Sequence, residues 1–265
     1  MLKLAPLLLV PMLSAQDFST SPELTKVAAE TVREAIAAFG PGGLSEDRIA
    51  LTVIDLNDRK HPVWGSFNGE AAFYPASVCK LFYLNAAQAW MESGKLHETP
   101  ELDRAIHDMI VSSSNDATQL VVDMLTGTTG GPEMSDEELK PWLEKRNAVN
   151  RYYTGLGYHG INVNQKTFAE DAYGRERQNR GANLENGNRL TTNATARLWF
   201  AIVSEQAVSR ARSLAMMNLL RRDPFAPKST EPDEQALFFM GKSLPAGSQY
   251  YSKAGWTSSA RHDSA

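Results

Sequence analysis

The stretch YPASVCKLFYL (residues 74–84) places a lysine three residues after a serine at the beginning of an apolar helix. Residues three apart share one helix face, so the amine of Lys80 can reach the hydroxyl of Ser77 if the helix begins there. The neighbouring side chains are apolar, namely Phe73, Leu81, Phe82 and Leu84. Such a setting lowers the pKa of an amine, which lets it act as the base for a serine nucleophile. The alternative, a helix cap followed by a solvated lysine, is disfavoured by these neighbours.

A second pair of polar residues follows a predicted helix. Ser113 and Asn115 lie two residues apart and can present a hydroxyl and an amide to one cleft. The same residues also fit a loop and an N-cap for a helix that begins at Asp116, so the pair alone does not decide between a structural and a functional role.

A third group, Lys253-Ala254-Gly255, ends a predicted strand near the end of the chain. The lysine supplies positive charge, and the edge of the strand supplies backbone donors. Ser77, if it lies at a helix N-terminus, gains a further benefit, because the N–H groups there favour a developing oxyanion.

Composition limits the class of protein. The 265 residues carry 27 basic and 31 acidic side chains, for a net charge of -4 with no long basic run, so we do not expect nucleic acid as a partner. The one cysteine, Cys79, excludes an internal disulfide and is expected to pack in the core. The histidines lack ligand spacing and no phosphate-binding glycine loop occurs, so neither a metal nor a cofactor is predicted.

Residues 1–15, MLKLAPLLLVPMLSA, combine an early lysine, an apolar run and a small terminal residue. This pattern is typical of a secretory signal peptide, and a buried or disordered terminus is the alternative. The run is too short to cross a bilayer, and no later segment is long enough. We therefore expect a secreted or periplasmic protein without stable membrane insertion.

The order of predicted elements indicates an α+β fold. A helix that begins after Ser21 and two strands at residues 48–56 and 63–67 open the chain. Helices are predicted over residues 77–93, 100–111, 116–126, 136–155, 191–204, 208–222 and 233–241, and strand character returns at 249–252 and 258–265. We expect both ends of the chain to share one antiparallel sheet flanked by helices, while the middle forms an all-α lobe. The long segment 159–190 has weak periodicity and is expected to be functional or disordered.

Taken together, Ser77-x-x-Lys80, Ser113-x-Asn115 and Lys253-Ala254-Gly255 resemble the three signature motifs of class A β-lactamases and penicillin-binding transpeptidases. The resemblance covers most of the chain after residue 15, with segment 159–190 in the place of that family's omega loop. It implies one catalytic domain over residues 16–265, with an α/β layer from 20–68 and 206–265 and an all-α lobe over 69–205.

The resemblance also implies roles for individual residues. Ser77 would be the acylated nucleophile, Lys80 its base and Ser113 a proton relay. Asn115 would bind the substrate amide and Lys253 the substrate carboxylate. The backbone N–H groups of Ser77 and Trp256 would form the oxyanion hole, beside Gly255.

The sequence departs from the family pattern at three places. Ala254 stands where the family has a hydroxyl residue, so we expect Thr257, Ser258 or Arg261 to replace its hydrogen bond. The glutamate that activates the deacylating water has no matching motif; Glu170 is the best substitute and Glu176 the second, and both can equally be solvated loop carboxylates. Family members also continue with a further strand and a C-terminal helix, so we expect these 265 residues to be a fragment.

The functional prediction is a serine hydrolase that opens β-lactam rings through an acyl-enzyme on Ser77. Two alternatives use the same residues: a D-alanyl-D-alanine peptidase or esterase acting on acyclic substrates, and a penicillin-binding or cell-wall-binding protein that does not turn over. The expected partner is a β-lactam or a peptide derived from peptidoglycan, and the expected state is a monomer.

Overall fold

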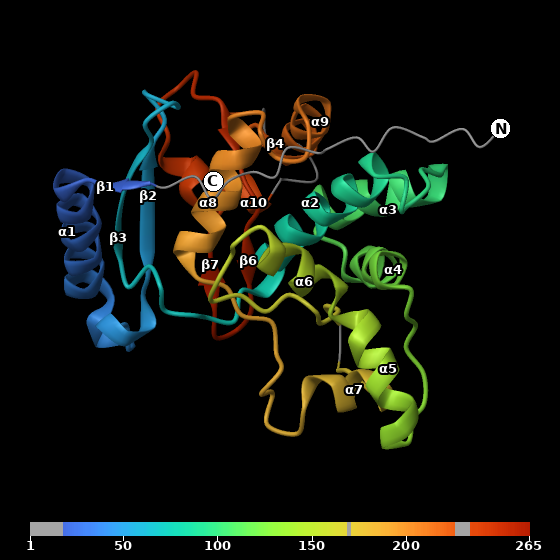
Figure 1. Ribbon diagram of the computed structural model, residues 1–265. Coiled ribbons are helices and arrows are strands. Elements are labelled where there is room, and N and C mark those ends of the chain that lie inside the picture. The colour runs from blue at the N-terminus through green and yellow to red at the C-terminus, as the bar shows by residue number, and fades with distance from the viewer. Residues whose placement is uncertain (1–17, 169–170, 226–233) are drawn as a thin grey trace.

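The computed structural model describes residues 18–168, 171–225 and 234–265, and it has the predicted mixture of helices and strands (Figure 1). The expected signal peptide at residues 1–15 lies outside the described residues. Within the described ranges, no helix combines the length and apolar character needed to cross a membrane. The α+β fold class predicted from the sequence is confirmed.

The first helix, α1 (Pro22–Phe39), begins as the sequence predicts. The hydroxyl of Ser21 accepts a hydrogen bond from the N–H of Leu24, and proline occupies the first turn, where its missing N–H costs nothing. The helix packs on β3 (Val63–Phe67) at Gly65, where an added Cβ would lie 2.2 Å from backbone atoms of α1. Glycine at this position therefore allows the helix to approach the sheet.

Among the described residues the strands form three separate sheets, which corrects the prediction of one sheet shared by both ends of the chain. In the first, β1 (Ser19–Thr20) runs parallel to β3, and β2 (Leu51–Asp55) pairs with β3 in antiparallel fashion. In the second, β4 (Arg221–Arg222) pairs with β5 (Tyr250–Tyr251), and in the third β6 (Gly255–Trp256) pairs with β7 (Arg261–His262). A groove lined by both β2 and residues 257–265 separates the first sheet from the third, so their backbones do not pair.

A central helix, α2 (Cys79–Glu92), organises the helical part of the molecule (Figure 1). Nearly all its side chains are buried, because other helices cover it on most sides. Around it lie α3 (Pro100–Ile110), α4 (Asn115–Thr126), α6 (Ala148–Gly155) and α9 (Arg210–Leu220). Cys79 is fully buried at the start of α2, which confirms it as a core residue.

The helix predicted over residues 136–155 is two helices, α5 (Asp136–Arg146) and α6, separated at Asn147. The predicted capping box at Ser135 is present. The break has a local cause, because the Asn147 side chain donates to the carbonyl of Leu143 and accepts from Asn150 and Asn164. A side chain that competes for backbone groups in this way ends a helix.

The helix α8 (Thr192–Val203) lies between the first sheet and α2 (Figure 1). Its Thr192 and Asn193 side chains both bond to the hydroxyl of Thr52 on β2. The helix α8 falls in the range predicted for the helical lobe. Its hydrogen bonds to Thr52 also connect it to the first sheet. Near the end of the chain, α10 (Glu234–Leu237) and a short 3-10 helix (Met240–Ser243) occupy the last predicted helical segment.

Segment 159–190 is more ordered than its weak periodicity indicates. It contains a short helix, α7 (Gly174–Arg180), and a bridge between Asn162 and Arg189 that closes its two ends. Side-chain amides form hydrogen bonds with the irregular backbone. For example, the side-chain oxygen of Asn188 accepts hydrogen bonds from the backbone N–H groups of Asn164 and Gln165. Asparagine supplies both donors and acceptors, which explains how a segment without a repeating pattern holds one conformation.

Candidate active site

Ser77 lies in a one-turn 3-10 helix (Ala76–Val78) that leads directly into α2. The preceding residue, Ala76, has a φ of 47°, a left-handed conformation that costs a residue with a side chain about 1 kcal/mol or more. Strand β6 runs against this turn: a Cβ added to Gly255 would lie 2.6 Å from the backbone nitrogen of Ser77. The glycine therefore lets the strand approach the serine backbone.

Lys80 is fully buried, and burial lowers the pKa of its amine from 10.5 to about 8. The amine donates to the carbonyl of Ser113 at 2.6 Å and to the side-chain oxygen of Asn115 at 2.9 Å, and its nitrogen lies 3.3 Å from the Ser113 hydroxyl. The predicted pairing with the hydroxyl of Ser77 is not formed between these two described residues, because the amine is directed at the Ser113 loop. Catalytic hydrogen bonds often tighten only when substrate binds.

Ser113 occupies the centre of the cluster. Its hydroxyl oxygen lies 3.3 Å from the nitrogen of Lys80 and 3.0 Å from that of Lys253. Its backbone is also left-handed, with a φ of 54°. Strained backbone conformations concentrate at functional sites, and here one is at Ser113 and another at Ala76, directly before Ser77.

Lys253 is fully buried on the segment between β5 and β6, as is the neighbouring Ala254. Besides Ser113, its amine donates to the side-chain oxygen of Gln235 at 2.5 Å and to the carbonyl of Ala254 at 2.9 Å. The amide nitrogen of Gln235 in turn donates to the carbonyls of Ile110 and Val111, at the end of α3. Gln235 thus ties Lys253 to the loop that carries Ser113, a role that no feature of the local sequence indicated.

Asn115 begins α4 and joins the cluster to segment 159–190. Its side-chain oxygen accepts from Lys80, while its amide nitrogen donates to the carbonyl of Phe168 at 3.1 Å. Glu170, the predicted activator of the deacylating water, lies outside the described residues.

Glu176, the second candidate for that role, is 1% exposed and is held in a buried ion network. Its two carboxylate oxygens accept from the guanidinium of Arg146 at 2.7 and 2.8 Å, and one lies 3.3 Å from the amine of Lys166. Lys166 and Arg146 also contact Asp123 on α4. The alternative of a solvated carboxylate is therefore wrong for Glu176, and its oxygens are engaged by cations instead of facing a free water.

We expect Glu176→Gln to lower the free energy of unfolding by about 3 to 5 kcal/mol, because it removes the bidentate charge partner of the buried Arg146 guanidinium and leaves the ion pair with Asp123 at 3.3 Å. Denaturant titration measures the change. Glu144→Gln is the matched control, since Glu144 pairs with Arg151 on the surface, where such a pair contributes less than about 1 kcal/mol. Equal effects of the two substitutions would contradict a structural role for Glu176.

The remaining predicted binding residues lie at the β6–β7 hairpin. Trp256 is 40% exposed, and the side chain of Thr257 accepts hydrogen bonds from the N–H groups of Ser259 and Ala260. Thr257 and Ser258 thus belong to an exposed turn and do not contact the cluster around Ser113. Arg261 donates to the carbonyl of Phe238 and stacks on the ring of Phe239, so the hydroxyl missing at Ala254 has no substitute among the contacts of these three side chains.

The geometry can be compared with known proteins. A family model described as the beta-lactamase enzyme family matches residues 97–265, which is more than half of the chain. The chain belongs to this family. The matched range contains Ser113, Asn115 and Lys253, and it begins after Ser77 and Lys80. In the structure, Lys80 contacts the matched range through its hydrogen bond to the carbonyl of Ser113.

Solved structures share the β-lactamase fold at low sequence identity. A β-lactamase from Sphaerobacter thermophilus aligns with a TM-score of 0.61 and 18% identity, over 88% of this chain and 81% of its own. A β-lactamase from Chitinophaga pinensis gives a TM-score of 0.52 and 16% identity, over 85% and 78%. PBP-A aligns with a TM-score of 0.55 and 14% identity, over 90% of this chain and 78% of its own. No curated protein matches the sequence significantly.

Proposed function

We propose that this member of the β-lactamase family is a serine hydrolase that opens β-lactam rings through an ester on Ser77. The observation that carries the proposal is the hydroxyl of Ser113 held between two fully buried amines, those of Lys253 and of Lys80 in the first turn of the helix that follows Ser77. Buried amines and a bridging hydroxyl provide a route for protons in a site with little water.

In the acylation step, the hydroxyl oxygen of Ser77 attacks the carbonyl carbon while its proton passes to the neutral amine of Lys80. The C–N bond of the cyclic amide then breaks, and the departing nitrogen receives a proton from Lys80 through the hydroxyl of Ser113. Because the amide is cyclic, the product is an ester on Ser77 that retains every atom of the substrate.

The negative charge that develops on the carbonyl oxygen needs donors at the head of α2. The backbone N–H of Ser77 and that of Trp256, on the adjacent strand, are the groups we assign to this role. The close approach of Gly255 to the Ser77 nitrogen supports the assignment, since a larger residue would force the strand away. Asn115 and Lys253 would bind the amide and carboxylate of the substrate.

A second candidate is a penicillin-binding protein that acylates without efficient turnover. Hydrolysis of the ester needs a base for the attacking water, and the ion pairs that engage Glu176 argue against that role for it. Ala254 also lacks the hydroxyl that would help to hold a substrate carboxylate. The first feature favours slow release of the acyl group, and the second weakens binding of the substrate before acylation.

Intact-mass spectrometry after exposure to benzylpenicillin tests these proposals. We expect the protein mass to rise by the mass of one intact penicillin, because ring opening releases no leaving group. An adduct that disappears with time indicates a β-lactamase, and one that persists indicates the non-turnover protein. If an adduct forms only with a D-alanyl-D-alanine peptide, and the bound group is that peptide without its terminal alanine, the result would favour the peptidase. If no adduct forms with any of these compounds, acylation on Ser77 would be refuted.

We further propose that the protein acts outside the cytoplasm, in the secreted or periplasmic space where β-lactams and peptidoglycan peptides occur. The support is the sequence of residues 1–15, whose early lysine, apolar run and small terminal residue suit a cleaved signal peptide. N-terminal sequencing of the exported protein tests it, with a mature terminus directly after Ala15 as the expected result.

A further inference from the structure

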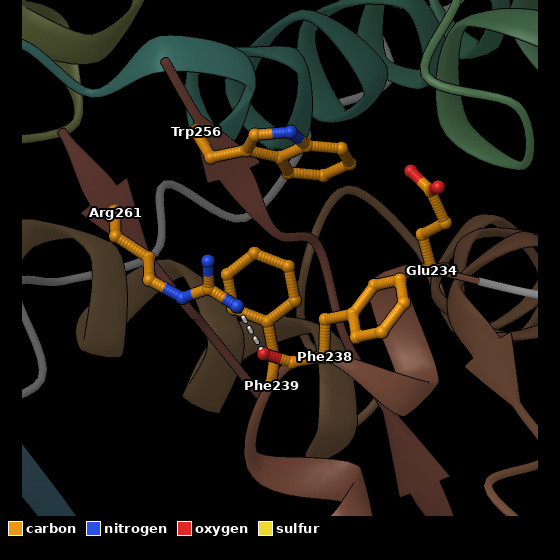
Figure 2. Close-up of a pocket in the computed structure, with 5 residues that line it drawn as sticks. All are labelled: Glu234, Phe238, Phe239, Trp256 and Arg261. Carbon is orange, nitrogen blue, oxygen red and sulfur yellow. Dashed lines mark hydrogen bonds between the residues drawn. The ribbon is translucent and has the colours of Figure 1, made fainter. Parts of the chain in front are cut away.

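A pocket of about 300 Å³ opens beside the β6–β7 hairpin, lined by Glu234, Phe238, Phe239, Trp256 and Arg261. Figure 2 shows the indole of Trp256 on one side and the two phenylalanine rings facing it, with Arg261 and Glu234 at opposite ends. The rings of Phe239 and Trp256 lie 5.4 Å apart between centroids and are tilted by 47°. The pocket is thus walled by aromatic surface and bounded by one charge of each sign.

Two residues that line the pocket are adjacent in the chain to residues that contact the proposed site. Trp256 directly follows Gly255, whose backbone lies against Ser77. On the other wall, Glu234 precedes Gln235, whose side-chain oxygen accepts from the amine of Lys253. A substrate bound along β6 with its carbonyl at Ser77 would therefore have one of its substituents next to this pocket.

The side chains that line the pocket indicate which kind of ligand it can bind. Phe238 is 57% exposed and Trp256 is 40% exposed, so both rings present apolar area that a ligand can cover. The guanidinium of Arg261 is already engaged, because it stacks 4.5 Å from the centre of the Phe239 ring and donates to the carbonyl of Phe238. It acts as a fixed flat wall, and the opposing charge of Glu234 makes the pocket a poor site for an anion.

We propose that this pocket binds a planar aromatic substituent of the substrate and makes the enzyme selective for aryl-bearing acyl donors. The inference rests on the proposed acylation of Ser77 and adds a substrate class to it. A planar ring suits the space between the indole and Phe238, where offset or edge-to-face packing stabilises aromatic pairs beyond the burial of their area. Phe238 and Trp256 are then specificity-determining residues that take no part in the chemical step.

The test compares two β-lactams that share one ring system, benzylpenicillin with its phenyl group and aminopenicillanic acid without an acyl side chain. In the wild-type protein we expect faster acylation by benzylpenicillin. In Phe238→Ala the benzylpenicillin rate should fall about five- to tenfold while the rate with aminopenicillanic acid stays unchanged. Phe238→Tyr should keep the preference, because it keeps the ring. Phe39→Ala, at an exposed phenylalanine on α1, is the matched control.

A binding measurement tests the aromatic pocket independently of the proposed acylation. Ser77→Ala cannot form the ester, so titration calorimetry with this variant measures reversible binding of the two compounds. We expect benzylpenicillin to bind more tightly, and the difference to be lost in the double variant with Phe238→Ala. Equal affinities, or a difference that survives the loss of Phe238, would overturn the aromatic pocket even if acylation occurs. Preferential binding without any adduct on the wild-type protein would retain the pocket and refute the acylation.

Discussion

Replacing Ser77 with alanine will lower the rate of acylation by benzylpenicillin by at least about a thousandfold, because it removes the hydroxyl that we propose forms the ester. Cys79 cannot replace it, since its thiol is fully buried and burial raises its pKa from 9.0 to about 11. Alanine fits the helical turn at residue 77, so the fold should be preserved. Intact-mass spectrometry at fixed times measures the adduct, and thermal unfolding verifies the fold.

Ser93→Ala is the matched control for this substitution. Ser93 caps the opposite end of α2 and is exposed, with its hydroxyl bonded to the carbonyl of Trp90. Its loss should leave acylation unchanged. An adduct that forms on Ser77→Ala at the wild-type rate would show that the penicillin reacts elsewhere and would remove the basis of the proposed mechanism.

Lys80→Met will reduce acylation by about a hundred- to ten-thousandfold, the range expected for the loss of a general base. Methionine fills a similar volume without a charge, so this fully buried position should tolerate it. The wild-type rate should also depend on pH. Because burial lowers the pKa of Lys80 to about 8, the neutral amine is a minor form at pH 7, and the rate should rise with pH up to about 8 and then level off.

The pH profile separates a base from a structural lysine. The residual activity of Lys80→Met should lack the rise, whereas Lys140→Met, a change at an exposed lysine on α5, should retain it at the wild-type rate. A wild-type rate that is constant from pH 6 to pH 9 would exclude Lys80 as the base, even if the methionine variant were inactive.

Hydrogen bonds of the site also connect it to segment 159–190. Asn115 contacts Lys80 with one end of its amide and the carbonyl of Phe168 with the other. Two residues before Phe168, the amine of Lys166 lies 2.6 Å from Asp123, within the ion network that includes Glu176. The network therefore holds Lys166 and Glu176 of this segment in place. Three of its four charged side chains are buried, at a desolvation cost that ion pairing must offset, while Asp123 is 21% exposed.

Local signals in the sequence were sufficient to place most elements. Ser21 and the proline after it predicted the start of α1, and the capping box at Ser135 predicted that of α5. Such signals act over a few residues, through hydrogen bonds between a side chain and the backbone beside it, so they can be recognised without knowledge of the fold. Asn147 shows their limit, because part of what ends α5 there is a bond to Asn164, which is distant in the sequence.

The sequence by itself determined the set of candidate catalytic residues, namely Ser77, Lys80, Ser113, Asn115 and Lys253, and the apolar setting in which Lys80 lies. Only the tertiary structure decided how they meet. It directed the amine of Lys80 toward Ser113, recruited Gln235 to hold Lys253, and engaged Glu176 with Arg146. It also left the strands in three sheets, because a strand's composition specifies an extended backbone and not its partner. Contacts between residues far apart in the chain depend on how whole elements pack, which no local pattern encodes.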